Sequence, residues 1–495
     1  MFFQNPGIRS LLRMPSKIGT YIRGTGAGVA STVVQKGAGF ASVWLLNRVL
    51  AKGAYGDYEF AFTVLSILLL AGSGGFNHAV LYRLSRLEVP EGKLAGENYV
   101  GVALGYSLIL SLLVVAGIML YTTFGLTSPE DQRIAFWLSS LSFLIPLRTA
   151  RKTYKAWYQA RQRVPEALLF HKALPALCKM LFLAGAWLFW PTPEAVVGAV
   201  LLAEILPFTF WFARSPVNLL RLKEGLARWD VFYSLKLALT MGLSKSVKNA
   251  DIVMIGLLAG SEATAEYAVA SRLAFIITNS AHSTLNRILR PRVGRLLGSG
   301  REKELEAEYD QIRVVSLIVA LGLALCCAVV GHYILEIFGA YATAYPILMV
   351  LAAGHLFHVS FGMTGDYLKV AGYAGWSLAT TVGLLIGNVT LNWILITSFG
   401  GIGAAWATMC SYLAVNVVQS GIILRLDGIK VYNPSVLIAT LGAVGVALGG
   451  AFGVLSPVGT GVGIAAFWTG LAVLRREDLI TVLQHAIKWS KEVTT

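Results

Sequence analysis

Long apolar runs recur along the whole chain of 495 residues, and short polar or basic connections separate them. About 20 consecutive apolar residues suffice for a helix to cross the hydrocarbon core of a bilayer. Charged residues make up 14% of the chain, against about 25% in soluble domains. In lipid, a helix satisfies its backbone groups within one segment, whereas an open strand cannot. The pattern therefore predicts an all-α polytopic membrane protein.

We expect about 14 transmembrane helices from the length and hydropathy of these runs. They lie near residues 26–49, 57–82, 97–121, 132–154, 167–190, 194–213, 236–260, 264–288, 312–337, 344–369, 374–398, 401–424, 434–454 and 457–474. Lysine and arginine concentrate in alternate connections, so the positive-inside rule places both termini in the cytoplasm. One of these connections includes the basic residues from Arg148 to Lys172.

An internal repeat indicates two lobes of six helices each. Lys36 and Lys245 lie 209 residues apart, and at the same offset the run YRLSRL at 82–87 aligns with PRVGRL at 291–296. The period contains an even number of spans, so the lobes share an orientation and are related by an axis along the membrane normal. The expected organisation is a basic cytoplasmic segment at 1–25, an N-lobe at 26–213, a cytoplasmic linker at 214–235, a C-lobe at 236–425, two extra helices at 426–475 and a cytoplasmic tail at 476–495.

The span Leu239–Gly260 is apolar, yet it contains Lys245, Lys248 and Asp251 on less than half of its helical circumference. A charged side chain at the bilayer centre costs about 2.5–3.5 kcal/mol. We therefore expect this stripe to face a water-filled cavity that favours anions. The alternatives are lysines that extend to an interface and an ion pair between Lys248 and Asp251. The cations that we assign to the cavity are Lys36, Lys245, Lys248 and Arg272.

Three acidic residues inside spans are candidates for proton or sodium coupling, namely Asp251, Glu204 and Asp366. The alternatives are a salt bridge to Lys248 for the first and interfacial caps for the other two. Basic residues at the cytoplasmic helix ends could attract an anionic head group or form a gate, or they could simply be solvated near anionic lipid. These residues are Arg83, Arg86, Arg292 and Arg295. The cysteines and histidines have no metal-ligand spacing, so we expect no metal and no cofactor.

Several stretches resemble one known family. The segment RVLAKGAYGDYEFAFT at 48–63 and the segment NADIVMIGLLAGSEATAEYAVASRL at 249–273 resemble polysaccharide-type (Wzx-like) flippases of the multidrug/oligosaccharidyl-lipid/polysaccharide (MATE-like) superfamily. The resemblance implies alternating access and an oligosaccharide cargo on polyprenyl pyrophosphate, moved to the outer leaflet for O-antigen or exopolysaccharide biosynthesis. In relatives, basic residues of the first, seventh and eighth helices meet the diphosphate. The matching positions here are Lys36, Lys245, Lys248 and Arg272.

Two related transporters remain as alternatives, a peptidoglycan-precursor lipid flippase and a MATE-type drug or metabolite cation antiporter. The antiporter needs cavity carboxylates, whereas the expected cavity is positive. The outer connections are too short for a membrane glycosyltransferase or ligase, so we expect no enzyme. The implied location is the cell (inner) membrane. The implied partners are the lipid-linked oligosaccharide, membrane lipids and polysaccharide polymerase or assembly proteins, with no nucleic acid and a monomeric state.

Overall fold

A computed structural model describes residues 16–85, 93–126, 128–161, 163–212, 228–339, 341–431 and 433–480. Within these ranges the chain forms helices joined by short connections, with no strand. Eight helices of the described part are long and apolar enough to cross a membrane. The expected all-α polytopic architecture is confirmed.

The chain divides into two compact units, Met1–Ser246 (unit 1) and Val247–Thr495 (unit 2). The division falls inside a helix, whereas the sequence pattern places it in the linker at 214–235. Most of that linker lies outside the described residues, as do the first part of the segment at 1–25 and most of the tail at 476–495.

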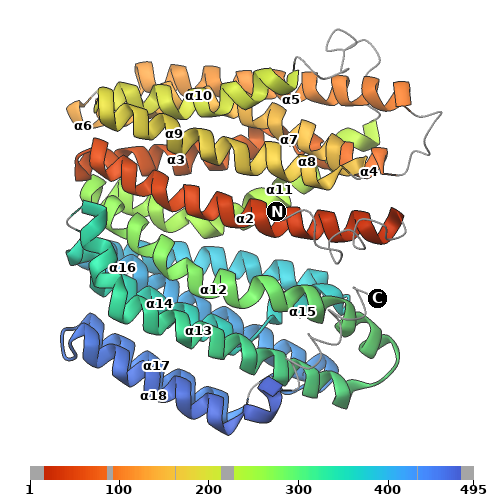
Figure 1. Ribbon diagram of the computed structural model, residues 1–495, viewed down its shortest axis with the longest axis vertical. Coiled ribbons are helices and arrows are strands. Elements are labelled where there is room, and N and C mark those ends of the chain that lie inside the picture. The colour runs from red at the N-terminus through yellow and green to blue at the C-terminus, as the bar shows by residue number, and fades with distance from the viewer. Residues whose placement is uncertain are drawn as a thin grey trace, which may run out of the picture. The chain divides into compact units, whose positions relative to one another are not determined.

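Unit 1 is built around helix α7, and Figure 1 shows its helices from red to yellow-green. The helices are α2 (Ser16–Val49), α3 (Lys52–Ser73), α4 (Phe76–Leu84), α5 (Lys93–Phe124), α6 (Pro129–Ser142), α7 (Leu144–Ala160), α8 (Val164–Leu168), the π-helix η1 (Leu169–Ala173), α9 (Leu174–Phe189), α10 (Pro193–Phe212) and the first part of α11 (Arg228–Leu258). Helix α7 packs against α3, α4, α5, α8 and α10. Its buried aromatic side chains, Tyr154, Trp157 and Tyr158, belong to the core of the unit. The backbone of α7 is therefore held in place by packing on several sides.

A break between α3 and α4 lets α11 pack closely on unit 1. Gly74 and Gly75 have φ values of 53° and 72°, a region that glycine adopts without steric cost. A Cβ atom at Gly75 would lie 2.2 Å from the carbonyl oxygen of Ser234 in α11. Near this break, Arg83 of α4 forms an ion pair with the buried carboxylate of Asp230 in α11. These contacts fix the first half of α11 within unit 1.

Unit 2 contains the rest of α11 and the helices that follow it, from green to blue in Figure 1. They are α12 (Gly260–Gly298), α13 (Glu302–Gly339), the 3-10 helix η3 (Ala342–Ala344), α14 (Tyr345–Ser360), α15 (Thr364–Val370), α16 (Ala374–Asp427), α17 (Pro434–Ala451) and α18 (Pro457–Leu474). Helix α14 is almost entirely buried because α12, α13, α16 and α17 pack around it. Helix α16 is two helices in one run, since Gly400 interrupts it with φ 59° and ψ −137°. This break separates the expected spans 374–398 and 401–424.

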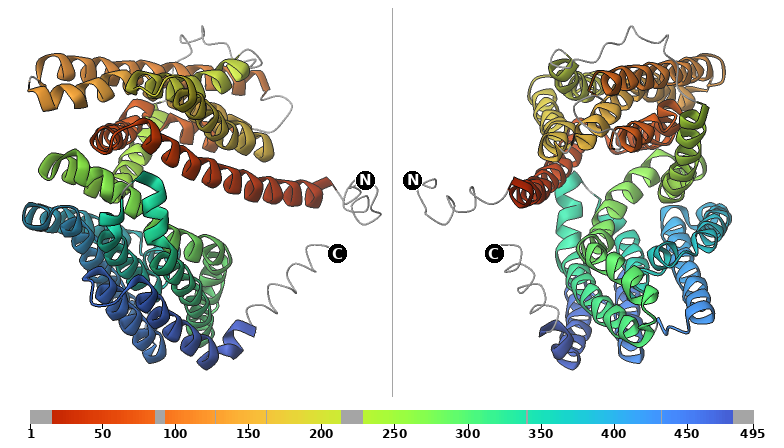
Figure 2. Two further views of the ribbon diagram at one scale, coloured as in Figure 1. Left: turned by 60° about the vertical axis from the view of Figure 1, so that its left-hand side comes forward. Right: turned by 90° about the vertical axis from the view of Figure 1, so that its right-hand side faces the viewer.

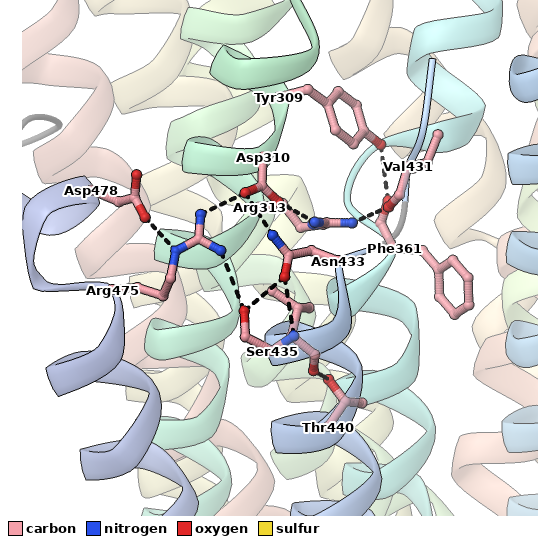
Figure 3. Close-up of polar contacts among 11 residues, drawn as sticks. Tyr309, Asp310, Arg313, Phe361, Val431, Asn433, Ser435, Thr440, Arg475 and Asp478 are labelled. Carbon is pink, nitrogen blue, oxygen red and sulfur yellow. Dashed lines mark hydrogen bonds and ion pairs between the residues drawn. The ribbon is translucent and has the colours of Figure 1, made fainter. Parts of the chain in front are cut away.

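The last two helices are fastened to α13 by a polar cluster, shown in Figure 3. Asp310 of α13 accepts hydrogen bonds from Arg475 (2.5 Å) and Asn433 (3.1 Å), and it forms an ion pair with Arg313. Arg475 also contacts Asp478 at 2.5 Å. Burial alone would lower the pKa of the Arg475 guanidinium, but the hydrogen bonds to the two aspartates outweigh it and raise that pKa. Figure 2 shows α17 and α18 side by side at the edge of unit 2.

Candidate functional site

The basic side chains of α7 form a cluster with Lys172 and with Lys245 of α11. Arg148, Arg151, Lys152 and Lys155 recur at helical spacing along α7, so they share one face of the helix. All of these side chains are partly buried. We call Arg148, Arg151, Lys152, Lys155, Lys172 and Lys245 the α7 basic cluster.

Glu204 of α10 orders the two arginines of the cluster. Its carboxylate accepts a hydrogen bond from Arg148 Nε at 2.8 Å and lies 3.3 Å from a terminal nitrogen of Arg151. The guanidinium of Arg148 also lies over the ring of Phe62, 4.7 Å from its centroid. Because a buried carboxylate that pairs with arginines is costly to separate from them, this part of the cluster is rigid.

The lysines of the cluster lie close to other positively charged side chains. Lys152 is close enough to Lys245 and Arg151 for their charges to repel, and Lys155 is close enough to Lys172. The ammonium group of Lys245 donates to the backbone carbonyl of Ser66 in α3. Repulsion among partly buried cations raises the free energy of the unit, and a bound anion relieves it. The arrangement is therefore suited to a multiply charged anion such as a pyrophosphate.

Sequence reasoning did not identify the α7 residues as a site. The positive-inside rule assigned them to a cytoplasmic connection, and the structure adds that these side chains are partly buried on α7, which continues to Ala160. The signal that could have found them is the spacing in RTARKTYK at 148–155, where cations recur every three or four residues.

The predicted cavity cations fall in different surroundings. Lys245 belongs to the α7 basic cluster. Lys36 is exposed on α2, one turn after Thr32, whose hydroxyl lies 3.5 Å from Lys172 Nζ. Arg272 is half-buried on α12 of unit 2. The side chain of Lys248 lies outside the described residues. The cavity role of these four residues stays a prediction.

Asp251 is the centre of a buried polar network in unit 2. Its carboxylate accepts hydrogen bonds of 2.7 Å from Tyr267, Thr408 and Asn392. The amide of Asn392 also donates to Asn388 Oδ1 at 3.0 Å. The carbonyl oxygen of Asn392 is buried and has no hydrogen-bond partner within the described part of the chain. Five oxygen-bearing side chains from α11, α12 and both halves of α16 thus belong to one hydrogen-bonded network.

Three of the other predicted residues, Glu204, Asp366 and Arg83, have ion-pair partners in the structure. Glu204 pairs with the two arginines, so we assign it to positioning rather than to ion exchange. Asp366 lies 3.4 Å from Lys369 on the same helix. Arg83 pairs with Asp230 and lies over the ring of Tyr99. Arg295 is exposed on α12. Arg86 and the side chain of Arg292 lie outside the described residues.

The described residues contain no group of three or more histidine, cysteine, aspartate or glutamate side chains that could hold a metal ion. The oxygen set around Asp251 is instead of the kind that hard cations prefer.

Comparisons with known proteins agree with this architecture. The sequence model of the polysaccharide biosynthesis protein family matches residues 21–297, and the MatE model matches residues 237–394. The probable low-salt glycan biosynthesis flippase Agl15 of Haloferax volcanii is 23% identical over 395 residues, which cover 77% of this chain and 79% of Agl15.

Solved structures of transporters share the fold. The lipid II flippase MurJ, in an inward closed conformation, has a TM-score of 0.67 at 14% identity and covers 91% of this chain and 100% of MurJ. An inward-facing multidrug resistance MATE family transporter of the MOP superfamily has a TM-score of 0.63 at 14% identity, with 80% of this chain and 95% of that chain covered. The MATE-like fold that the sequence predicted is confirmed, and these matches are to transporters and flippases rather than to catalytic enzymes.

Proposed function

Because the chain belongs to the polysaccharide biosynthesis protein family, we propose that this multi-pass membrane protein flips a polyprenyl-pyrophosphate-linked oligosaccharide. The lipid moves from the cytoplasmic to the outer leaflet of the cell inner membrane, with both termini of the protein in the cytoplasm. The glycan then enters a surface polysaccharide such as O-antigen or exopolysaccharide.

The α7 basic cluster is the observation that carries this proposal. A pyrophosphate head cannot pass through hydrocarbon, because its charges and the sugar hydroxyls would lose their water without replacement. The six cations of the cluster, of which only Arg148 and Arg151 pair with Glu204, supply that replacement. A drug cation would meet repulsion at the same place, so the cluster favours a flippase over a cation antiporter.

The arginines and lysines of the cluster have different tasks. Glu204 holds Arg148 and Arg151 in fixed orientations, which gives a rigid, positively charged surface. Lys152 and Lys245 act as point charges on flexible stems that follow the phosphates as the head moves. The cavity role predicted from the sequence for Lys36, Lys248 and Arg272 is part of this proposal, in which alternating access exposes the bound head group to one leaflet at a time.

In this proposal, Asp251 couples lipid transport to the binding of a sodium ion. Its carboxylate, the unpartnered carbonyl oxygen of Asn392 and the hydroxyl groups of Tyr267 and Thr408 together can coordinate a sodium ion. Its position on α11 matters because the same helix carries Lys245 six residues earlier. Ion binding to Asp251 and substrate binding to Lys245 therefore act on the same helix.

The test is transport in vesicles. The purified full chain is reconstituted in proteoliposomes with a fluorescent polyprenyl pyrophosphate that carries a short glycan, and a membrane-impermeant quencher reports the outer-leaflet fraction. We expect transport by the wild type, at least a tenfold slower rate for Lys245→Ala and partial rescue by Lys245→Arg. The matched control Lys303→Ala, at an exposed lysine of α13, should transport normally.

Two results would contradict the proposal. Wild-type protein that leaves the lipid in its original leaflet refutes the flippase, and a Lys245→Glu variant with full activity refutes the cationic path. A peptidoglycan-precursor lipid added as competitor decides between the two lipid-linked cargoes. A precursor flippase would transport it at least as fast as the oligosaccharide lipid, so transport of the fluorescent lipid would slow.

A further inference from the structure

A further cation of unit 1, Lys179 of α9, lies at membrane depth outside the α7 basic cluster. It stands at the middle of the expected span 167–190, where a charged side chain is costly and usually marks a functional site. Its ammonium group donates a hydrogen bond of 3.0 Å to the hydroxyl of Tyr58 in α3. An ammonium group has three protons, and within the described residues the other two have no acceptor. The residue is only partly buried, so these donors remain for a ligand.

No carboxylate of the described part forms an ion pair with Lys179. Glu204 is close enough for the two charges to attract, but its oxygens already contact Arg148 at 2.8 Å and Arg151 at 3.3 Å. The Lys179 ammonium group instead lies 5.3 Å from the ring centroid of Phe62 and 5.5 Å from that of Tyr58. Aromatic rings stabilise a cation less than a counter-ion does at this depth. A bound anion would compensate the remaining charge.

Lys179 continues the α7 basic cluster toward the middle of the membrane. Near the proposed cytoplasmic end, Lys155 of α7 lies close to Lys172. Deeper in the unit, Arg148 of α7 and Lys179 lie over the same ring, that of Phe62. Each of the two helical runs separates its shallow and deep cations by seven residues, which is about 10 Å along a helix. A phosphate group that leaves the shallow cations therefore meets a second set one step deeper.

The internal repeat gives an independent sign that this position binds a charged ligand. At the offset of 209 residues, Tyr58 corresponds to Tyr267 and Lys179 corresponds to Asn388. In unit 2, these two positions belong to the network of Asp251. The carboxylate of Asp251 has no counterpart in unit 1, where the corresponding position is a serine. Related positions thus hold a negative charge in unit 2 and a positive charge in unit 1, so the site of unit 1 is suited to an anion.

We propose that Lys179, Tyr58 and Arg148 form a second phosphate site, which receives the pyrophosphate of the lipid from the shallow end of the α7 basic cluster. Tyr58 orients the ammonium group and leaves two of its protons for phosphate oxygens. Arg148 binds Glu204 through Nε alone, so its terminal nitrogens can also donate to a phosphate. The inference rests on the proposed function, because it gives the next position of the same head group.

The test is photolabelling of the purified full chain in vesicles. The probe is polyprenyl pyrophosphate without a glycan and with an aryl azide on its terminal phosphate, and the control probe carries the same aryl azide on polyprenol without phosphate. Peptide mapping separates the deep segments 52–63 and 174–189 from the segment 148–172. We expect the phosphate probe to label the deep segments, excess unlabelled polyprenyl pyrophosphate to lower this label at least fivefold, and the control probe to leave them unlabelled.

Three variants assign the label to the charge of Lys179. Lys179→Gln should lower labelling of the deep segments at least fivefold, with the label on 148–172 within twofold of the wild type. Lys179→Arg keeps the charge and should retain at least half of the deep label, and Lys303→Gln should behave as the wild type does. The Tm of Lys179→Gln should equal or exceed that of the wild type, because an uncompensated charge is removed.

Four results would overturn the inference. They are wild-type protein without label in the deep segments, full deep labelling of Lys179→Gln, equal deep labelling by the probe without phosphate, and a loss in Lys179→Gln that comes with a lower Tm and that Lys179→Arg does not restore. The last result would give Lys179 a structural role. Orthophosphate that displaces the label as well as polyprenyl pyrophosphate does at the same concentration would make this a site for a free anion and overturn its assignment to the lipid.

The outcome is separable from that of the transport assay. Protein that flips the glycan lipid without label in the deep segments overturns the second phosphate site and leaves the flippase intact. Competed, Lys179-dependent labelling of wild-type protein that does not flip the lipid overturns the proposed function while supporting the site.

Discussion

Replacement of Asp251 by asparagine removes a charge while keeping the shape of the side chain. In the wild type the carboxylate accepts three hydrogen bonds of 2.7 Å from Tyr267, Thr408 and Asn392. With asparagine, one oxygen becomes an NH2 group, and it meets at least one of these donors. The charge that holds a sodium ion disappears, so the variant should lose sodium-dependent stabilisation.

The size of the effect follows from linkage. At a sodium concentration 100 times the dissociation constant, binding to the native state adds about 2.7 kcal/mol to the free energy of unfolding. In a unit of this size each kcal/mol raises the Tm by about 2–4 °C, so the expected shift is about 5–10 °C. Without sodium, the Asp251→Asn variant should melt below the wild type, because the new NH2 group leaves at least one buried donor without its acceptor.

The assay is thermal unfolding of the detergent-solubilised full chain in sodium chloride and in choline chloride at equal ionic strength. The wild type should show the shift, Asp251→Asn should not, and Asp366→Asn should keep it, since Asp366 lies outside the network. Identical wild-type Tm values in the two salts would refute sodium binding at this network. A complete sodium shift in Asp251→Asn would refute the role of Asp251.

Two further predictions concern stability. Gly400→Ala should lower the free energy of unfolding by about 1–3 kcal/mol, and with it the Tm, because only glycine readily adopts its backbone angles. The control Gly421→Ala, in a regular exposed turn of α16, should instead raise the free energy of unfolding by about 0.5–1 kcal/mol. An equal effect of both changes would contradict the argument. Asp310→Ala leaves Arg313 and Arg475 without their shared carboxylate. It should lower the free energy of unfolding by about 1–3 kcal/mol and speed proteolysis between α16 and α17. An unchanged cleavage rate and Tm would show that α17 and α18 are held by apolar packing alone.

Much of the fold could be predicted because membrane depth sets helix length. The described helices lie on the expected spans, although the spans 57–82, 132–154 and 344–369 are each divided into two helices. The break between 374–398 and 401–424 was expected, since a glycine-rich run at 400–401 separates two apolar stretches. The close approach of α11 to the break between α3 and α4 could not be predicted, because the contact between Gly75 and Ser234 joins residues far apart in the sequence.

The candidate site was only partly predictable. Lys245 and Asp251 stand out in sequence because charges are costly in an apolar span. Their partners do not, since Thr408 lies 157 residues from Asp251 and becomes its neighbour only when α16 packs against α11. The arginines of α7 carry a second ambiguity, because a basic run at the end of a span has the same appearance whether it is solvated or packed inside the unit.

The central claim is that the α7 basic cluster binds pyrophosphate, and an equilibrium binding measurement tests it most directly. The probe is polyprenyl pyrophosphate without a glycan, titrated into the detergent-solubilised full chain of the wild type and of Lys152→Gln/Lys245→Gln. Two charged hydrogen bonds are worth about 3 kcal/mol, so the double variant should bind about 150-fold more weakly, with an unchanged or higher Tm because repulsion is relieved. Lys303→Gln should bind as the wild type does. A double variant that binds within twofold of the wild type would contradict the claim.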